Sequence, residues 1–371
     1  MCMLVAITNN KYFSITDNYS REQLIKLRKQ QKFLCPQCKS NVQLKVGKVK
    51  TPHFAHLPEE RCRNLFSEGE SETHLLGKIA LYNFFKKAGK NVVLEPYITF
   101  LSQRPDLLIH DQNETYAIEF QCSTIDSDLL MKRNSGYVQN GMRPFWVLNT
   151  PLKYVQETDR ITIVSLTKFE QQFIVNDDYD YLLTFHPKTN TFYYFAHLLH
   201  LQNNQFITKI KRLPIHHQMF PFIKPKKVAF PQFLSMLKLY KKKTQTYVEN
   251  KIYTSQKGVN DILLRSIYEL KLNRFNMPLF LGIPTKHAMS MKMAAVEWQT
   301  ALFYYCQLHS KDISQLSKYD IEQFIAWLKL ERSDEKIIAI SSYVEFLKGL
   351  DIDGIKEGKH EIQVFEKLYT I

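Results

Sequence analysis

The sequence lacks the long apolar runs of membrane proteins and has few of the residues that build disulfide-bonded or collagen-like proteins. Its 371 residues include 6 Cys, 11 Gly and 14 Pro. A membrane-spanning helix needs about 20 consecutive apolar residues, and disulfide or collagen frameworks need many more Cys or Gly. The first ten residues, MCMLVAITNN, have no basic segment before the apolar one, so we expect no secretion signal. These absences predict a cytoplasmic protein with reduced cysteines and no membrane span.

Apolar residues are abundant, and basic residues are in excess. Hydrophobic residues make up 44% of the chain and aromatic residues 13%, which is enough for a real core and excludes a disordered protein. The chain has 50 Lys and Arg against 36 Asp and Glu, a formal net charge of +14. Residues 201–300 alone hold 17 basic and 4 acidic residues, so one segment carries nearly all of the excess.

This basic segment is a candidate surface for nucleic acid. Lysines that neutralise phosphates release counterions, and the aromatic residues interleaved with them can stack on unpaired bases. The candidates for DNA binding in this segment are Lys224, Lys226, Lys227, Lys241, Lys242 and Lys243. The alternative is a solvated lysine-rich surface over an aromatic core, because a charge cluster does not by itself identify its partner.

The order of predicted elements divides the chain into three parts. Residues 1–65 combine short β-prone runs with a Cys and His cluster, and we expect a small zinc-ribbon-like domain there. In residues 66–155 a helix, three strand-like runs, a second helix and a further strand predict an α/β domain with a mixed sheet. Residues 156–371 carry the basic excess and, from about residue 230, long segments of helical periodicity. We expect this last part to be a basic, mainly helical domain.

Five potential zinc ligands lie close together in the first part. Cys35 and Cys38 are separated by two residues, the spacing with which two thiolates grip one zinc ion, and His53, His56 and Cys62 follow. A structural zinc site needs four ligands, and we expect the three cysteines together with either histidine. The alternative is a pair of buried structural cysteines with surface histidines.

Two acidic residues adjoin neighbouring strand-like runs. Asp106 precedes an apolar run, and Glu119 follows the next one, with Gln121 two residues later on the same strand face. If the two runs form a hairpin, Asp106 and Glu119 lie close together and can bind Mg²⁺ or Mn²⁺ between them. Such an ion activates water for phosphodiester hydrolysis, and Gln121 would orient the water or the phosphate. The structural alternative is a strand-capping aspartate and an exposed strand glutamate.

The helix before these strands adds three polar residues on one face. Glu70, His74 and Lys78 recur at intervals of four. Glu70 could supply a further contact to the metal or its water, and Lys78 a contact to the scissile phosphate. We include His74 among the catalytic candidates, although a single histidine more often has a structural role.

The ordered motifs of residues 1–150 resemble the competence protein CoiA family. The resemblance rests on the Cys35-Pro-x-Cys38 and His53-Phe-Ala-His56 motifs, on Cys62, on Glu70-Ser-x-x-His74-x-x-x-Lys78, on Pro105-Asp106, on Ile118-Glu119-Phe120-Gln121 and on Arg133-x-x-x-Tyr137. It implies a restriction-endonuclease-like core of the PD-(D/E)xK type, with Asp106 and Glu119 as metal-binding acids and Glu70 as the helix acid. We add Arg133 and Tyr137 to the DNA-binding candidates.

Gln121 departs from the general pattern of that superfamily, which has a lysine there. A neutral amide cannot supply positive charge to the transition state. Lys78, Lys132 or Arg133 could compensate from a neighbouring helix, and the family itself resembles this chain in having Gln.

Three hypotheses follow for the function. The first is a Mg²⁺-dependent nuclease that acts on incoming single-stranded DNA or branched recombination intermediates during natural transformation. The second is a non-catalytic DNA-binding adaptor for a recombinase or other competence proteins, which would use the basic segment. The third is a zinc-dependent protein-interaction module in which the nuclease-like layer is only a scaffold.

Overall fold

The computed structural model describes residues 2–17, 19–57, 71–156, 159–352, 354 and 361–370. A six-stranded antiparallel sheet forms the N-terminal part, in the order β1-β6-β5-β4-β2-β3. Its strands are β1 (Cys2–Met3), β2 (Val5–Thr8), β3 (Lys11–Ser14), β4 (Phe33–Leu34), β5 (Asn41–Lys45) and β6 (His53–His56). Helix α1 (Arg21–Gln30) begins at a capping box in which the Ser20 side chain accepts a hydrogen bond from the backbone of Gln23.

An eight-stranded mixed sheet forms the centre of the molecule, in the order β11-β14-β13-β12-β10-β9-β8-β7. Strand β10 runs parallel to both β9 and β12, and the other pairs are antiparallel, which confirms the mixed α/β layer. The strands are β7 (Asn91–Leu94), β8 (Leu107–Asp111), β9 (Glu114–Gln121), β10 (Met142–Asn149), β11 (Ile161–Ser165), β12 (Tyr181–His186), β13 (Thr191–Gln202) and β14 (Gln205–Pro214). The accompanying helices are α2 (Glu72–Lys87), α3 (Ser127–Gln139) and α4 (Lys168–Gln171).

The central sheet runs across the domain boundary that the sequence predicts at residue 155. Strand β12 pairs with β10, with Leu148 opposite Thr184. Residues 161–214 therefore form four strands of the same sheet, and the predicted helical character begins only at Phe230. Residues 191–196, Thr-Phe-Tyr-Tyr-Phe-Ala, are buried without alternation, so the period of two that marks a half-exposed strand is missing.

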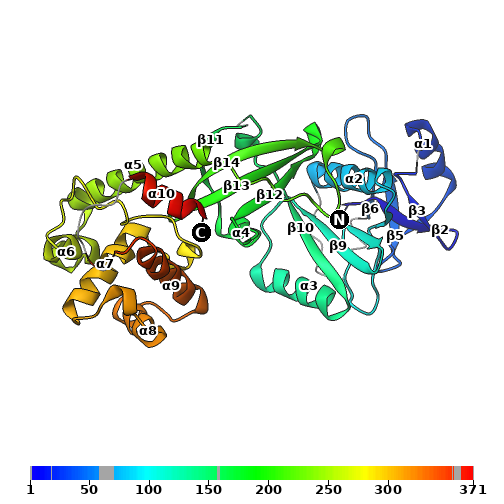
Figure 1. The fold of residues 1–371 in the computed structure, drawn as a ribbon. Coiled ribbons are helices and arrows are strands. Elements are labelled where there is room, and N and C mark those ends of the chain that lie inside the picture. The colour runs from blue at the N-terminus through cyan, green and yellow to red at the C-terminus, as the bar shows by residue number, and fades with distance from the viewer. Residues whose placement is uncertain are drawn as a thin grey trace.

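The C-terminal part is helical, as expected, and lies at the opposite end of the central sheet from the N-terminal strands (Figure 1). Its helices are α5 (Phe230–Thr254), α6 (Ile262–Glu269), α7 (Ala295–Leu308), α8 (Lys318–Trp327), α9 (Asp334–Lys348) and α10 (Glu361–Thr370). The helices pack around large buried side chains that include Trp298 and Tyr343. None of the described helices combines the length and the apolar character that a bilayer crossing requires.

Helix α2 packs unusually close to strand β9. It begins after Ser71, whose hydroxyl caps the backbone N–H of His74, and buries an apolar face that includes Leu75 and Phe85. A Cβ atom on Gly77 would overlap the ring of Phe120. Glycine in a helix costs about 0.5–1 kcal/mol relative to alanine, but here it allows the close contact. As a result, the polar residues on this helix face reach the beginning of β8.

Candidate active site

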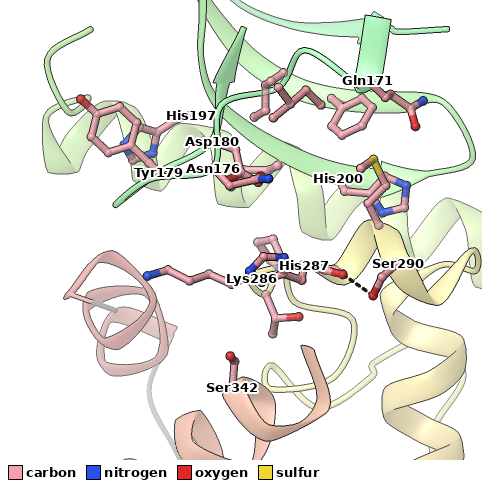
Figure 2. A pocket seen from close by; sticks show the side chains of 18 of the residues that line it. Gln171, Asn176, Tyr179, Asp180, His197, His200, Lys286, His287, Ser290 and Ser342 are labelled. Carbon is pink, nitrogen blue, oxygen red and sulfur yellow. Dashed lines mark hydrogen bonds between the residues drawn. The ribbon is translucent and has the colours of Figure 1, made fainter. Parts of the chain in front are cut away.

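A cavity of about 780 Å³ lies between the central sheet and the C-terminal helices (Figure 2). Its lining carries both signs of charge, including Asp180 and Lys286. Burial raises the pKa of Asp180 to about 6 and lowers the pKa of His197 to about 4. None of the catalytic candidates lines this cavity, and its mixed charge selects no single class of ligand. The candidate active site is therefore elsewhere, at the meeting point of α2, β8 and β9.

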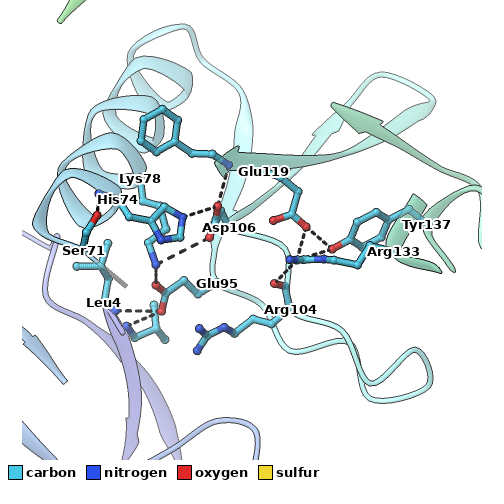
Figure 3. Close-up of polar contacts among 12 residues, drawn as sticks. Leu4, Ser71, His74, Lys78, Glu95, Arg104, Asp106, Glu119, Arg133 and Tyr137 are labelled. Atoms are coloured by element: carbon cyan, nitrogen blue, oxygen red, sulfur yellow. Dashed lines mark hydrogen bonds and ion pairs between the residues drawn. The ribbon is translucent and has the colours of Figure 1, made fainter. Parts of the chain in front are cut away.

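Asp106 and Glu119 occupy neighbouring positions on the hairpin β8–β9. The register pairs Leu107 with Ile118, which puts Asp106 and Glu119 opposite each other at the next step of the ladder. Both are buried, with 9% and 2% of their surface exposed. Figure 3 shows Asp106 between the α2 residues and Glu119. The predicted hairpin is thus confirmed, with Asp106 directly before β8 and Glu119 on the adjacent strand β9.

Asp106 is surrounded by hydrogen-bond donors and positive charge. Its Oδ2 accepts from His74 Nε2 at 3.0 Å and from the Phe120 backbone N–H at 2.8 Å, and its Oδ1 lies 3.9 Å from Lys78 Nζ. Burial alone would raise the pKa of Asp106, but His74, Lys78 and the Phe120 N–H together hold it well below its usual value. Asp106 is therefore an anion at neutral pH, and His74 contacts it directly.

The pKa of Glu119 is shifted in the opposite direction to that of Asp106. Its Oε1 accepts from the Tyr137 hydroxyl at 2.5 Å and from the Arg133 guanidinium. Burial raises the pKa of Glu119 to about 7, and the negative charge of Asp106 adds to this rise, while Arg133 opposes it. The two buried carboxylates therefore resist being ionised together, because the negative charge of Asp106 disfavours a negative charge on Glu119.

Arg133 and Tyr137, which the sequence adds to the DNA-binding candidates, both contact the Glu119 carboxylate in the structure. Tyr137 is fully buried in a small cluster between α3 and the sheet. Arg133 also donates to the Arg104 carbonyl oxygen at 3.2 Å and lies over the ring of Trp146. Their i, i+4 spacing on α3 brings both side chains to one carboxylate, which is the physical reason for the motif.

Lys78 also differs from its expected role. Its side chain is completely buried and forms an ion pair with Glu95, which is itself only 1% exposed. A phosphate contact would require Lys78 to leave this pair. Sequence reasoning missed Glu95, although its position directly after the apolar residues of β7 repeats the arrangement of Glu119 after Ile118.

Gln121, a further catalytic candidate, does not join this network. Gln121 is partly exposed, and its amide donates to the Ser123 carbonyl oxygen at 2.8 Å. Glu70 lies outside the described residues. In the described part of the chain, no group of three or more Cys, His, Asp or Glu ligand atoms lies within 4.8 Å around Asp106 and Glu119. The two carboxylates are nevertheless the type of oxygen ligand that Mg²⁺ or Mn²⁺ takes.

A second group of ligands is assembled in the N-terminal sheet. The ligand atoms of Cys35, Cys38 and His56 lie within 4.8 Å of one another, and Cys38 Sγ lies 3.2 Å from His56 Nε2. Burial acts to raise the pKa of Cys38, but hydrogen bonds from Ser40 and His56 outweigh it and lower the value to about 6, so this sulfur has thiolate character. This group could bind a metal ion, and its sulfur and imidazole ligands suit zinc.

The geometry distinguishes between the two candidate histidines. His56 belongs to the group, whereas the His53 ring donates from Nδ1 to the Thr51 carbonyl oxygen at 2.8 Å. Cys62, the expected fourth ligand, lies outside the described residues.

We therefore expect Cys38→Ser to remove the bound metal and His53→Ala to leave it in place. Loss of one thiolate of a structural site removes much of its binding free energy, which is folding free energy. Elemental analysis should give roughly one zinc ion per chain in the wild type and in His53→Ala, and much less in Cys38→Ser. A full zinc content in Cys38→Ser would contradict this ligand set.

The lysines predicted to bind DNA differ in their exposure and in their contacts within the protein. Lys241 Nζ donates to the carbonyl oxygens of Pro278, Leu279 and Leu281, and burial lowers its pKa to about 8. It joins α5 to a loop and is not a surface charge. Lys242 and Lys243, the next two residues of α5, are exposed.

The lysines before α5 are exposed, but two of them have protein partners. Lys224 forms an ion pair with Asp177, and Lys227 donates to the Tyr369 carbonyl oxygen at 2.6 Å. Lys226 is exposed, and its carbonyl oxygen accepts from Lys211. Some of the positively charged groups in this segment thus bind other groups of the same protein.

Comparison with known proteins agrees with this geometry. Residues 16–65 match the family model described as competence protein CoiA, N-terminal domain, and residues 70–228 match competence protein CoiA, nuclease-like domain. The second match extends beyond residue 155 and includes strands β11–β14. The competence protein CoiA of Bacillus subtilis strain 168 is 27% identical over 357 residues, which cover 91% of each chain. No solved structure matches. From both domain matches in chain order and this full-length relative, we conclude that the chain belongs to the competence protein CoiA family.

Proposed function

We propose that this protein is a Mg²⁺- or Mn²⁺-dependent nuclease that cleaves DNA during natural transformation. The observation that carries the proposal is the buried pair formed by Asp106, directly before β8, and Glu119 on β9, with His74 bonded to Asp106, inside a domain that matches a nuclease-like family. We further propose single-stranded or branched DNA as the substrate and a recombinase or other competence proteins as partners. The N-terminal metal site would be a structural zinc site.

Each residue of the candidate site would have a separate role. Asp106 and Glu119 supply carboxylate oxygens, His74 orients Asp106, and Arg133 and Tyr137 hold Glu119 in place. When bound, a divalent cation supplies an activated water and stabilises charge on the phosphate oxygens.

The direct test is cleavage of labelled single-stranded, duplex and branched DNA with Mg²⁺ or Mn²⁺. Glu119→Gln keeps the shape of the side chain and its acceptor oxygen for Tyr137 but removes its charge. We expect cleavage by the wild type and loss of cleavage in this variant. Equal cleavage by both would refute the proposal.

The raised pKa of Glu119 predicts a pH dependence of metal binding. Below about pH 7 Glu119 holds its proton in the metal-free protein, so the proton must leave when a cation binds. The affinity for Mn²⁺ should therefore rise by about tenfold per pH unit below pH 7 and level off above it. Tyr137→Phe removes a hydrogen bond that lowers this pKa, so its transition should move to higher pH. Titration calorimetry at several pH values checks both expectations, and a flat profile contradicts them.

A DNA-binding adaptor is the second candidate function, and the exposed Lys242 and Lys243 favour it. If both contact phosphates, the double variant Lys242→Ala/Lys243→Ala should weaken DNA binding and reduce the slope of log affinity against log salt by about 2. Lys241→Ala is the matched control: it should leave the salt slope unchanged and lower the melting temperature, because Lys241 is tied to backbone carbonyls. Fluorescence anisotropy with a labelled oligonucleotide at several salt concentrations measures the slopes. An unchanged slope in the double variant excludes these two lysines.

A further inference from the structure

Glu95 is a buried carboxylate that contacts three separate parts of the protein. It lies at the end of β7 and is 1% exposed. Its Oε2 accepts from the backbone N–H groups of Leu4, at 2.9 Å, and Val5, at 3.3 Å, while its Oε1 forms the ion pair with Lys78. Its own backbone N–H donates to the Asp106 carbonyl oxygen at 2.9 Å. Figure 3 shows Glu95 between Leu4, Lys78 and Asp106.

The chain segment that Glu95 holds is packed directly against the Cys and His group. Met3 precedes Leu4, and its sulfur lies 3.9 Å from Cys35 Sγ. Met3 also pairs with Phe54 in β6, the strand that ends at the metal-ligating residue His56. Met3, Leu4 and Cys35 have no exposed surface, so they are closely packed. A shift of the loop that carries Cys35 would therefore move Met3 and Leu4 as well.

On the other side, Glu95 determines the position of Lys78. The Lys78 ammonium group lies between Glu95 and Asp106, 3.9 Å from Asp106 Oδ1. A buried carboxylate that loses two backbone donors depends more strongly on the cations near it, here Lys78 and Arg104, because an unsatisfied buried charge is costly. Movement of Leu4 and Val5 away from Glu95 would therefore shift the Glu95 carboxylate and, through the ion pair, change the distance from Lys78 to Asp106.

We propose that Glu95 couples the Cys35–Cys38–His56 group to Asp106, so that metal binding in the N-terminal sheet sets the geometry of the candidate active site. Glu95 is a positioning residue in this arrangement. The inference rests on the proposed function only for the role of Asp106 in metal binding; the contacts from which the coupling is inferred do not depend on that function.

The test combines two variants, alone and together, with a measurement of Mn²⁺ affinity. Cys38→Ser disturbs the N-terminal group, and Glu95→Gln keeps an acceptor oxygen for Leu4 and Val5 but removes the charge that holds Lys78. The concentration of free Mn²⁺, read by electron paramagnetic resonance, gives the affinity of the acidic pair, because thiolates bind Mn²⁺ poorly. We expect Cys38→Ser to weaken Mn²⁺ binding by about tenfold in the wild-type background and to have no further effect in the Glu95→Gln background. Equal weakening in both backgrounds overturns the coupling.

Hydrogen exchange separates this inference from the proposed function. We expect a zinc chelator to accelerate amide exchange in residues 72–82 and 104–110 of the wild type, and to have a much smaller effect on these segments in Glu95→Gln. If the wild type binds no Mn²⁺, the proposed function fails, but the exchange experiment still decides the coupling. If the chelator leaves the exchange rates of both segments unchanged in the wild type, the coupling is overturned. This outcome needs no variant, so it holds even if Glu95→Gln does not fold.

Discussion

Asp106→Asn should abolish metal-dependent DNA cleavage while the protein remains folded. Asparagine has the same shape, and its amide oxygen can still accept from His74 and from the Phe120 N–H, as Asp106 Oδ2 does. The variant loses the negative charge that would hold a divalent cation. Because such an ion contributes several kcal/mol of charge stabilisation, the rate should fall by about 10²-fold or more.

Asp111→Asn is the matched control for this experiment. Asp111 is the last residue of β8, the strand that Asp106 directly precedes, and it pairs with Lys90 at 2.7 Å. Its replacement should leave cleavage within about twofold of the wild type, since surface ion pairs contribute little. Single-turnover cleavage and the melting temperature of each variant are the measurements. If Asp106→Asn lacks cleavage but supports normal transformation in cells, the adaptor function is the physiological one.

Local patterns were sufficient to predict the elements that build the candidate site. The first helix predicted in residues 66–155 corresponds to α2, the predicted hairpin that carries Asp106 and Glu119 corresponds to β8–β9, and the second predicted helix corresponds to α3. In each case the apolar period and the turn or capping residues lie within one short segment. The pairing of Asp106 with Glu119 followed from the same hairpin.

Contacts between distant segments could not be predicted in this way. Lys78 is on the helix face expected, but its partner Glu95 lies 17 residues away on another element, and nothing in the spacing connects them. The same holds for Lys241, whose carbonyl partners lie 37 to 40 residues later. A lysine in a charged run is normally solvated, so only the packed structure shows that its ammonium group is enclosed.

Lys78→Met should destabilise the protein far more than the loss of an ion pair that solvent reaches. It removes the cation from a pair in which Lys78 is fully buried and Glu95 is 1% exposed, and it leaves the Glu95 carboxylate without its closest positive charge. Breaking a buried pair from one side costs about 3–5 kcal/mol. Replacing both partners, in Lys78→Met/Glu95→Gln, should recover part of this loss, because no uncompensated charge then remains in the core.

Lys90→Met provides the comparison for a solvent-accessible pair. The Lys90–Asp111 pair is 23% and 19% exposed, so its loss should cost less than about 1 kcal/mol. Urea unfolding of the wild type, both single variants and the double variant gives the free energies, with equal slopes required for the comparison. A Lys78→Met variant no less stable than Lys90→Met would mean that Glu95 takes up a proton or finds another cation when Lys78 is removed. In that case the exchange pattern around Leu4 should also stay unchanged, since the carboxylate would still be satisfied at both of its oxygens.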